Sequence, residues 1–140
     1  FPGMRSQTMR LLQEESELQE IVQLVGQDAL SFQDQFKLEA CKSIREDYLH
    51  QNAFHEVDTY SSTNKQYKLL KLILGYYEMG MDGIEKGADY NTLVKLPIRE
   101  SIGRFKYVEE KDIDASYETI MAEMTANIQE LINEGGEQVD

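Results

Sequence analysis

Apolar residues recur at three- and four-residue steps along most of the chain, a spacing typical of amphipathic helices. The first such stretch predicts a helix from about Ser6 or Thr8 to Val25, and Gly26 fits a left-handed stop directly after it. Strand-like alternation of polar and apolar residues is hard to find. The pattern therefore predicts an all-α fold, a helical bundle.

A second helix is predicted after a short polar break. Ser31 followed by Asp34 resembles a capping box with Asp in place of Glu, and the apolar face continues to about Leu49 or His50. Beyond this point the residues turn polar and lose their periodicity.

The third predicted helix is capped by Ser62 or Thr63 and is apolar on both faces. A helix of this kind is normally covered on two sides, so we expect it at the centre of the domain. Gly75, Gly80 and Gly83 lie inside it, which indicates either close packing or a break.

The stretch between the third and the last helix has shorter elements. Asp89 can cap a short turn up to Lys95, and Pro97 suits the first position of another helix.

The last helix is predicted to begin after Asp112 or Asp114 and to end before Gly135. We expect residues 1–140 to form a single domain, with frayed tails at about 1–5 and 134–140.

Charge and composition narrow the class of protein. The 140 residues carry 26 acidic and 14 basic side chains, a net charge of -12, which disfavours nucleic-acid binding. No apolar run is long enough to span a membrane, so we expect no direct membrane insertion.

The chain has a single cysteine, Cys41, which forbids an internal disulfide and agrees with a cytosolic protein. Because Cys41 lies on an apolar stripe, we expect its thiol to be buried and to serve packing.

One glycine pair has the spacing of a phosphate-binding loop. The run from Gly75 to Gly80 continues with Met81 and Asp82, however, whereas such a loop needs a Lys-Ser or Lys-Thr pair to hold phosphate and magnesium. We therefore expect a helix there.

A carboxylate and an imidazole, Asp47 and His50, share one helical face and form half of a di-metal carboxylate site. The second half is missing, because His55 lies in a loop without the same register. The sequence predicts no metal-ligating and no catalytic residue in this chain.

The polar stretch from Gln51 to Tyr60 contains two aromatic residues, Phe54 and Tyr60, with Val57 midway between them. Aromatic rings on a loop can stack on a planar ligand, and they can equally anchor the loop to the core. Spacing alone favours the anchor.

Several long runs are similar to one protein family, the catalytic A subunit (alpha chain) of archaeal and vacuolar-type rotary ATPases, in its C-terminal part. The similarity extends from about Arg10 to Asn133. It is carried by Leu11–Gly26, Asp28–Leu30, Ile44–Tyr60, Lys65–Leu74 and Leu96–Glu100.

The resemblance implies a helical domain of a subunit that alternates with B subunits in a hexameric head around a rotating central shaft. ATP synthesis or hydrolysis is coupled there to ion transport, on the cytoplasmic face of the membrane. The family's phosphate-binding loop and magnesium ligands belong to an upstream nucleotide-binding domain. ATP or ADP with Mg²⁺ is thus expected in the parent subunit, and the isolated chain is expected to be inactive and to hold no cofactor tightly.

The resemblance also implies an adenine pocket. In the related F-type catalytic subunit an aromatic-x-x-small-x-x-aromatic run forms this pocket, and Phe54, Val57 and Tyr60 match it residue by residue.

A second implied surface is the acidic lever that contacts the shaft, with Asp28, Leu30 and Asp34 at the corresponding places. Ser31-Phe32-Gln33 replaces the proline and acidic residues expected there, which makes this lever less charged. The competing interpretation is an independent helical protein-interaction module without a nucleotide role.

Overall fold

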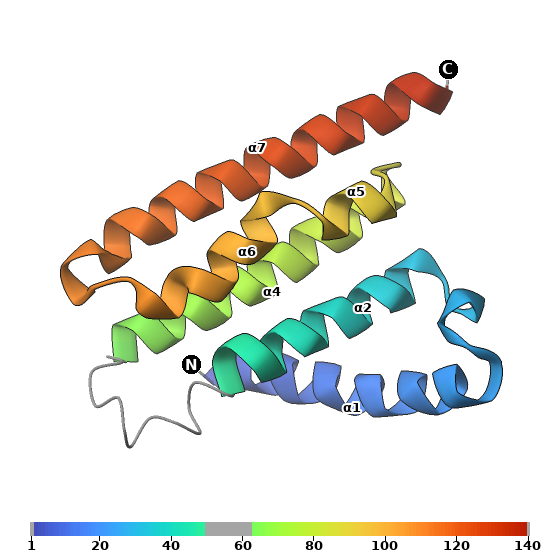
Figure 1. The fold of residues 1–140 in the computed structure, drawn as a ribbon, viewed down its shortest axis with the longest axis horizontal. Helices are drawn as coiled ribbons and strands as arrows, with labels where there is room; N and C mark the ends of the chain where they lie inside the picture. Colours follow the sequence, from blue (N-terminus) through green and yellow to red (C-terminus); the bar gives the residue numbers. More distant parts are fainter. Residues whose placement is uncertain (1, 50–62, 140) are drawn as a thin grey trace.

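The fold is described by a computed structural model that covers residues 2–49 and 63–139, with side chains from 3 to 49 and from 63 to 135. Helices and short helical turns make up nearly all of this part of the chain, and it contains no strand, which confirms the all-α prediction (Figure 1). The helices are α1 (Pro2–Val25), α2 (Phe32–Ser43), α4 (Thr63–Glu85), α5 (Tyr90–Val94), α6 (Pro97–Arg104) and α7 (Ile113–Val139). They are joined by 3-10 turns, η1 (Gln27–Ala29), η3 (Phe105–Tyr107) and η4 (Glu110–Asp112), while η2 (Ile44–Leu49) is a π-helical continuation of α2.

The central position predicted for the third helix is confirmed. Helix α4 packs against α2 on one side and α7 on the other, while α1 and α2 form a hairpin and the short α5 and α6 lie beside α4 and α7 (Figure 1). Buried side chains of α4 come from both of its faces, with Leu70 and Leu74 on one and Leu69, Leu72, Ile73 and Tyr76 on the other. Within 2–49 and 63–139, no helix is long and apolar enough to cross a bilayer.

The glycines of α4 serve close packing, because the helix is continuous from Thr63 to Glu85. A Cβ atom on Gly80 would overlap the ring of Phe36, and one on Gly83 would lie 3.1 Å from the Ile128 side chain. The break considered from the sequence does not occur.

Of the two capping signals predicted at the α1–α2 turn, the Ser31 N-cap is confirmed, whereas the left-handed helical conformation expected at Gly26 is not. Gly26 follows α1 with φ 90° and ψ 158°, a region that favours glycine although it is not the left-handed helical one, and its amide donates to the carbonyl of Val22 at 2.8 Å. The backbone N–H of Asp34 donates to Ser31 Oγ at 3.1 Å, the bond expected of an N-cap.

The short elements also begin as predicted. Asp89 Oδ2 accepts from the backbone N–H of Thr92 at 2.9 Å at the start of α5, and Pro97 opens α6. Helix α7 starts directly after Asp112, whereas the Asp114 carboxylate bonds to α4.

The predicted start of the first helix and the predicted end of the last helix are wrong. Helix α1 begins at Pro2, not at Ser6 or Thr8, because Met4 packs against the core and its carbonyl accepts from Thr8 Oγ1 at 2.8 Å. Helix α7 passes through Gly135 to Val139. Gly135 is buried against the backbone of Gly87, so its missing side chain permits a close approach and does not end the helix.

Candidate functional site

The predicted functional residues lie in two parts of the chain, the polar stretch from Gln51 to Tyr60 and the turn between α1 and α2. Phe54, Val57 and Tyr60, and also His50, lie outside the described residues. The structure does describe the two stems of that segment, the π-helix that ends at Leu49 and the first turn of α4.

The stem before the segment is held by a charged network. Asp47, only 7% exposed, uses one carboxylate oxygen, Oδ2, to accept both from Arg99 Nη1 of α6 and from Ser43 Oγ, each at 2.9 Å. A Cβ on Gly103 of α6 would lie 3.4 Å from Asp47 Oδ1, an ordinary contact, so this approach does not depend on the glycine. A carboxylate considered for metal binding thus serves to join η2 to α6.

The stem after the segment is joined to the neighbouring turn. Lys65, also 7% exposed, donates from Nζ to the backbone carbonyl of Lys106 in η3 at 2.9 Å. Sequence reasoning missed the roles of Lys65 and Arg99, since their partners are far away in the sequence. Each residue was noted only as part of a run that carries the resemblance, Lys65–Leu74 or Leu96–Glu100.

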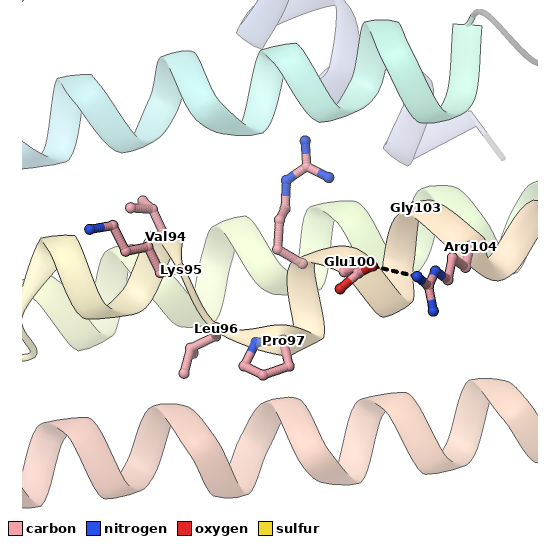
Figure 2. Close-up of a pocket in the computed structure, with 8 residues that line it drawn as sticks. Val94, Lys95, Leu96, Pro97, Glu100, Gly103 and Arg104 are labelled. Atoms are coloured by element: carbon pink, nitrogen blue, oxygen red, sulfur yellow. Dashed lines mark hydrogen bonds and ion pairs between the residues drawn. The ribbon is translucent and has the colours of Figure 1, made fainter.

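The exposed side of α6 borders an open pocket of about 500 Å³ at its junction with α5. Figure 2 shows Lys95 near one end of this pocket and Arg104 near the other. Arg104 Nη2 is paired with Glu100 Oε1 at 2.5 Å, one turn away on the same helix. The pocket is shallow, and part of its charge is already neutralised.

The predicted lever residues lie in three different environments. Asp28 is exposed in η1, and Asp34 is half-buried in the first turn of α2. Leu30 is only 8% exposed, so its side chain belongs to the core and does not offer the outward contact expected of it.

Other apolar residues are exposed at this turn instead. Leu24 is 84% exposed, Val25 follows it at the end of α1, and Phe32 opens α2, where its ring stacks on Tyr90 at 5.2 Å. We call Leu24, Val25 and Phe32 the apolar tip. A signal for it was present in the sequence, since large apolar residues immediately flank the polar turn after Gly26.

The other residues considered for chemistry in the sequence, Cys41 and the glycine pair of α4, have structural roles in the fold. Cys41 is buried, its Sγ donates to the carbonyl of Leu11 at 3.3 Å, and burial raises the pKa of the thiol to about 12, which confirms a packing role. Within the described ranges, no three His, Cys, Asp or Glu side chains gather as a metal site would require. The glycine pair of α4 is helical, as predicted.

Comparison with known proteins gives a consistent result. Residues 1–94 match the family described as the C-terminal domain of V and A type ATP synthase. The V-type ATP synthase alpha chain of Acetivibrio thermocellus is 58% identical over 129 residues, which cover 92% of this chain and 22% of that protein. The V-type ATP synthase alpha chain of Clostridioides difficile is 54% identical over 136 residues, 97% of this chain and 23% of that protein. The V-type ATP synthase alpha chain of Thermoanaerobacter pseudethanolicus is 55% identical over 133 residues, which cover 95% of this chain and 22% of that protein. The chain thus spans less than a quarter of these relatives.

Proposed function

We propose that this chain, which belongs to the family of the C-terminal domain of V and A type ATP synthase, supplies the adenine-side wall of a nucleotide site and a lever that contacts a rotating shaft. The observation that carries the first role is the run Phe54-x-x-Val57-x-x-Tyr60 in a chain of this family. Two aromatic rings with a small apolar residue between them suit stacking on a purine.

The proposed site is completed by residues outside this chain. An upstream nucleotide-binding domain of the same subunit supplies the phosphate-binding loop and the Mg²⁺ ligands, and neighbouring B subunits complete the head. The whole complex couples ATP synthesis or hydrolysis to ion transport at the cytoplasmic face of a membrane. This chain contributes binding energy and mechanical contact to that reaction.

The isolated chain is then a weak binder without turnover. Stacking contributes about 1–3 kcal/mol per base, whereas micromolar affinity requires about 8 kcal/mol. A calorimetric titration of the chain with ATP should give a dissociation constant no tighter than millimolar. Micromolar affinity or measurable hydrolysis by the chain alone would contradict the proposal.

The lever role rests on charge and exposure at the α1–α2 turn. Between Gly26 and Phe36 the chain has two acidic residues and no basic one, and the apolar tip stands at the turn. Asp28 and Asp34 supply negative charge there, while the buried Leu30 anchors the turn to the core. A shaft surface with apolar residues and flanking lysines or arginines would complement this turn.

Replacing Phe54 by Ala in the complete ATP synthase tests the adenine role. We expect the dissociation constant for ADP to rise while kcat at saturating ATP changes little, because stacking is present in both the ground and transition states. Tyr107→Ala is the matched control, since Tyr107 is an exposed aromatic outside the proposed pocket. Equal effects of the two substitutions, or none from Phe54→Ala, would argue against an adenine contact.

The exposed tip also favours a second candidate, an independent helical interaction module. Leu24→Ser should lower ion transport per ATP hydrolysed if the tip is a lever, and Met9→Ser, an exposed apolar residue earlier in α1, should not. The module would be preferred if Leu24→Ser weakened only binding to a separate protein while Phe54→Ala left nucleotide affinity unchanged.

A further inference from the structure

An open groove runs along the surface of α5 and α6. The pocket of about 500 Å³ at the junction of these helices shares Lys95, Leu96 and Pro97 with a second hollow of about 350 Å³, which continues along α5 past Thr92 and Asn91. We call the two hollows together the α5–α6 groove. Neither the adenine role nor the lever role uses this surface.

The groove has a charge opposite to that of the whole chain. The stretch Lys95–Lys106 contains four basic residues and one acidic residue, whereas the chain has a net charge of -12. Two exposed cations, Lys95 and Arg104, lie near opposite ends of the larger pocket (Figure 2). A local excess of positive charge attracts an anionic partner and orients it on encounter.

The arginines beside the groove differ in how firmly they are held within the chain. Arg99 donates to the buried Asp47 and is therefore fixed by the fold. Arg104 pairs with Glu100 one turn away, and the two side chains are 73% and 66% exposed. An exposed pair of this kind contributes little stability, so a carboxylate from a partner can replace Glu100 at small cost.

The separation of the two exposed cations fits an extended peptide. Lys95 precedes the N-cap of α6 and Arg104 is the last of its eight residues, which span about 12 Å. An extended peptide rises about 3.3 Å per residue, so carboxylates four positions apart lie about 13 Å apart on one side of it. The residue midway between them points to the same side, and Leu96 and Pro97 give the groove an apolar lining.

We propose that the α5–α6 groove binds an acidic segment of a neighbouring protein chain in extended conformation, with carboxylates at positions i and i+4 and an apolar residue at i+2. Lys95 and Arg104 receive the two carboxylates, and Glu100 releases Arg104 on binding. A nucleic acid would also meet the acidic remainder of the domain, whereas a short peptide segment needs only the groove. The inference rests on the assembly of this chain into a larger complex, and it does not depend on the adenine or lever role.

Zero-length cross-linking of the purified complete ATP synthase tests this groove, because a carbodiimide joins a lysine amine only to a carboxylate in contact with it. Lys111 is the matched control, since it is 77% exposed and lies outside the groove, in η4. We expect mass spectrometry to identify Lys95 joined to an Asp or Glu of another subunit, at a yield several-fold above that of Lys111. Products of Lys95 with carboxylates of its own chain only, or equal yields at the two lysines, would overturn the proposal.

Two substitutions separate a docking role from a structural one. Arg104→Gln should lower the yield of the intermolecular Lys95 product several-fold, because one carboxylate contact is lost. Glu100→Gln should raise that yield, because Arg104 then has no internal carboxylate to leave. Both substitutions break the same internal pair, so a merely structural role would change the yield in the same direction. Changes of the same sign, or no change in either variant, would contradict docking.

Competition identifies the chemistry of the occupant. A peptide with glutamates four positions apart and a leucine midway should suppress the Lys95 product, and a peptide of the same composition with adjacent glutamates should not. Equal suppression by the two peptides, or none, would overturn the proposed spacing. Suppression by inorganic phosphate, but not by sodium chloride of equal ionic strength, would assign the groove to a phosphate-bearing ligand and overturn a protein occupant. The results for Phe54→Ala and Leu24→Ser are read from nucleotide affinity and coupling, so either role can fail while the cross-link stands, and the reverse.

Discussion

The ring of Phe36 in α2 occupies the place that a Cβ atom on Gly80 of α4 would take. Phe36 is fully buried and is flanked by the rings of Tyr76, at 5.2 Å in an edge arrangement, and Tyr77, at 6.3 Å and stacked. The absence of a side chain at Gly80 thus lets the hairpin pack directly onto the central helix.

Gly80→Ala should therefore destabilise the domain. The added methyl meets an aromatic ring that two tyrosines hold in place, and overpacking of this kind costs about 1–3 kcal/mol, which offsets the gain of about 1 kcal/mol in helix propensity.

Gly75→Ala is the control on the same helix. Its Cβ would lie 3.8 Å from Met121 Sδ, an ordinary contact, so the substitution should be neutral or stabilising by up to about 1 kcal/mol. Urea unfolding followed by circular dichroism measures both. Equal changes in the free energy of unfolding would show that the Phe36 ring is free to move aside.

The Cys41 thiol should resist alkylation in the folded chain. With its pKa raised to about 12 by burial, only about one part in ten thousand is thiolate at pH 8, and the thiolate is the nucleophile. Modification by N-ethylmaleimide, followed by mass spectrometry, should be slow in the native chain and fast in guanidinium. A Ser16→Cys variant supplies an exposed thiol for comparison, and similar rates at the two cysteines would contradict the buried position.

Asp114 should contribute a small pH-dependent stabilisation. A hydrogen bond from Lys68, and a second from Asn64, lower the pKa of this carboxyl below its usual value. Its contribution is therefore present above the unfolded-state pKa of about 3.9 and is lost as the pH falls through the lower folded-state pKa.

Asp114→Asn should accordingly flatten the dependence of stability on pH in the acidic range, at low salt more than at high salt because the pair is exposed. Urea unfolding at several acidic pH values tests it. Lys68→Met should reproduce much of this effect, and an unchanged pH profile in Asp114→Asn would show that the bond contributes nothing in solution.

Local signals explain what the sequence predicted well. The caps at Ser31 and Asp89 and the start at Pro97 each depend on residues within one turn, and the structure has all three. The two-faced apolar pattern of α4 likewise follows from its own residues. These features require no knowledge of distant contacts.

Long-range contacts explain what the sequence missed. Whether Gly80 marks a break or a close approach depends on Phe36 in another helix, and Asp47 could be considered a metal ligand because Arg99 lies 52 positions away. Leu30 resembled an outward lever residue, since its burial depends on how the hairpin folds back. The family resemblance identified the domain, and it too gave no pairing between η2 and α6.

The contact between Gly135 and Gly87 offers the last test, at the point where the predicted end of α7 is wrong. Gly87 has φ 105°, and a Cβ on Gly135 would overlap its backbone carbonyl oxygen. Backbone atoms cannot swing aside as the end of a flexible side chain does, so Gly135→Ala should destabilise the domain in spite of its better helix propensity. Gly3→Ala is the control, because nothing lies within 4 Å of the place that its added methyl would take and α1 already includes that residue. Hydrogen exchange near the C-terminal end of α7 should accelerate in Gly135→Ala and stay unchanged in Gly3→Ala. Equal exchange and equal free energies of unfolding in the two variants would mean that α7 continues past Gly135 without the close contact to the Gly87 backbone.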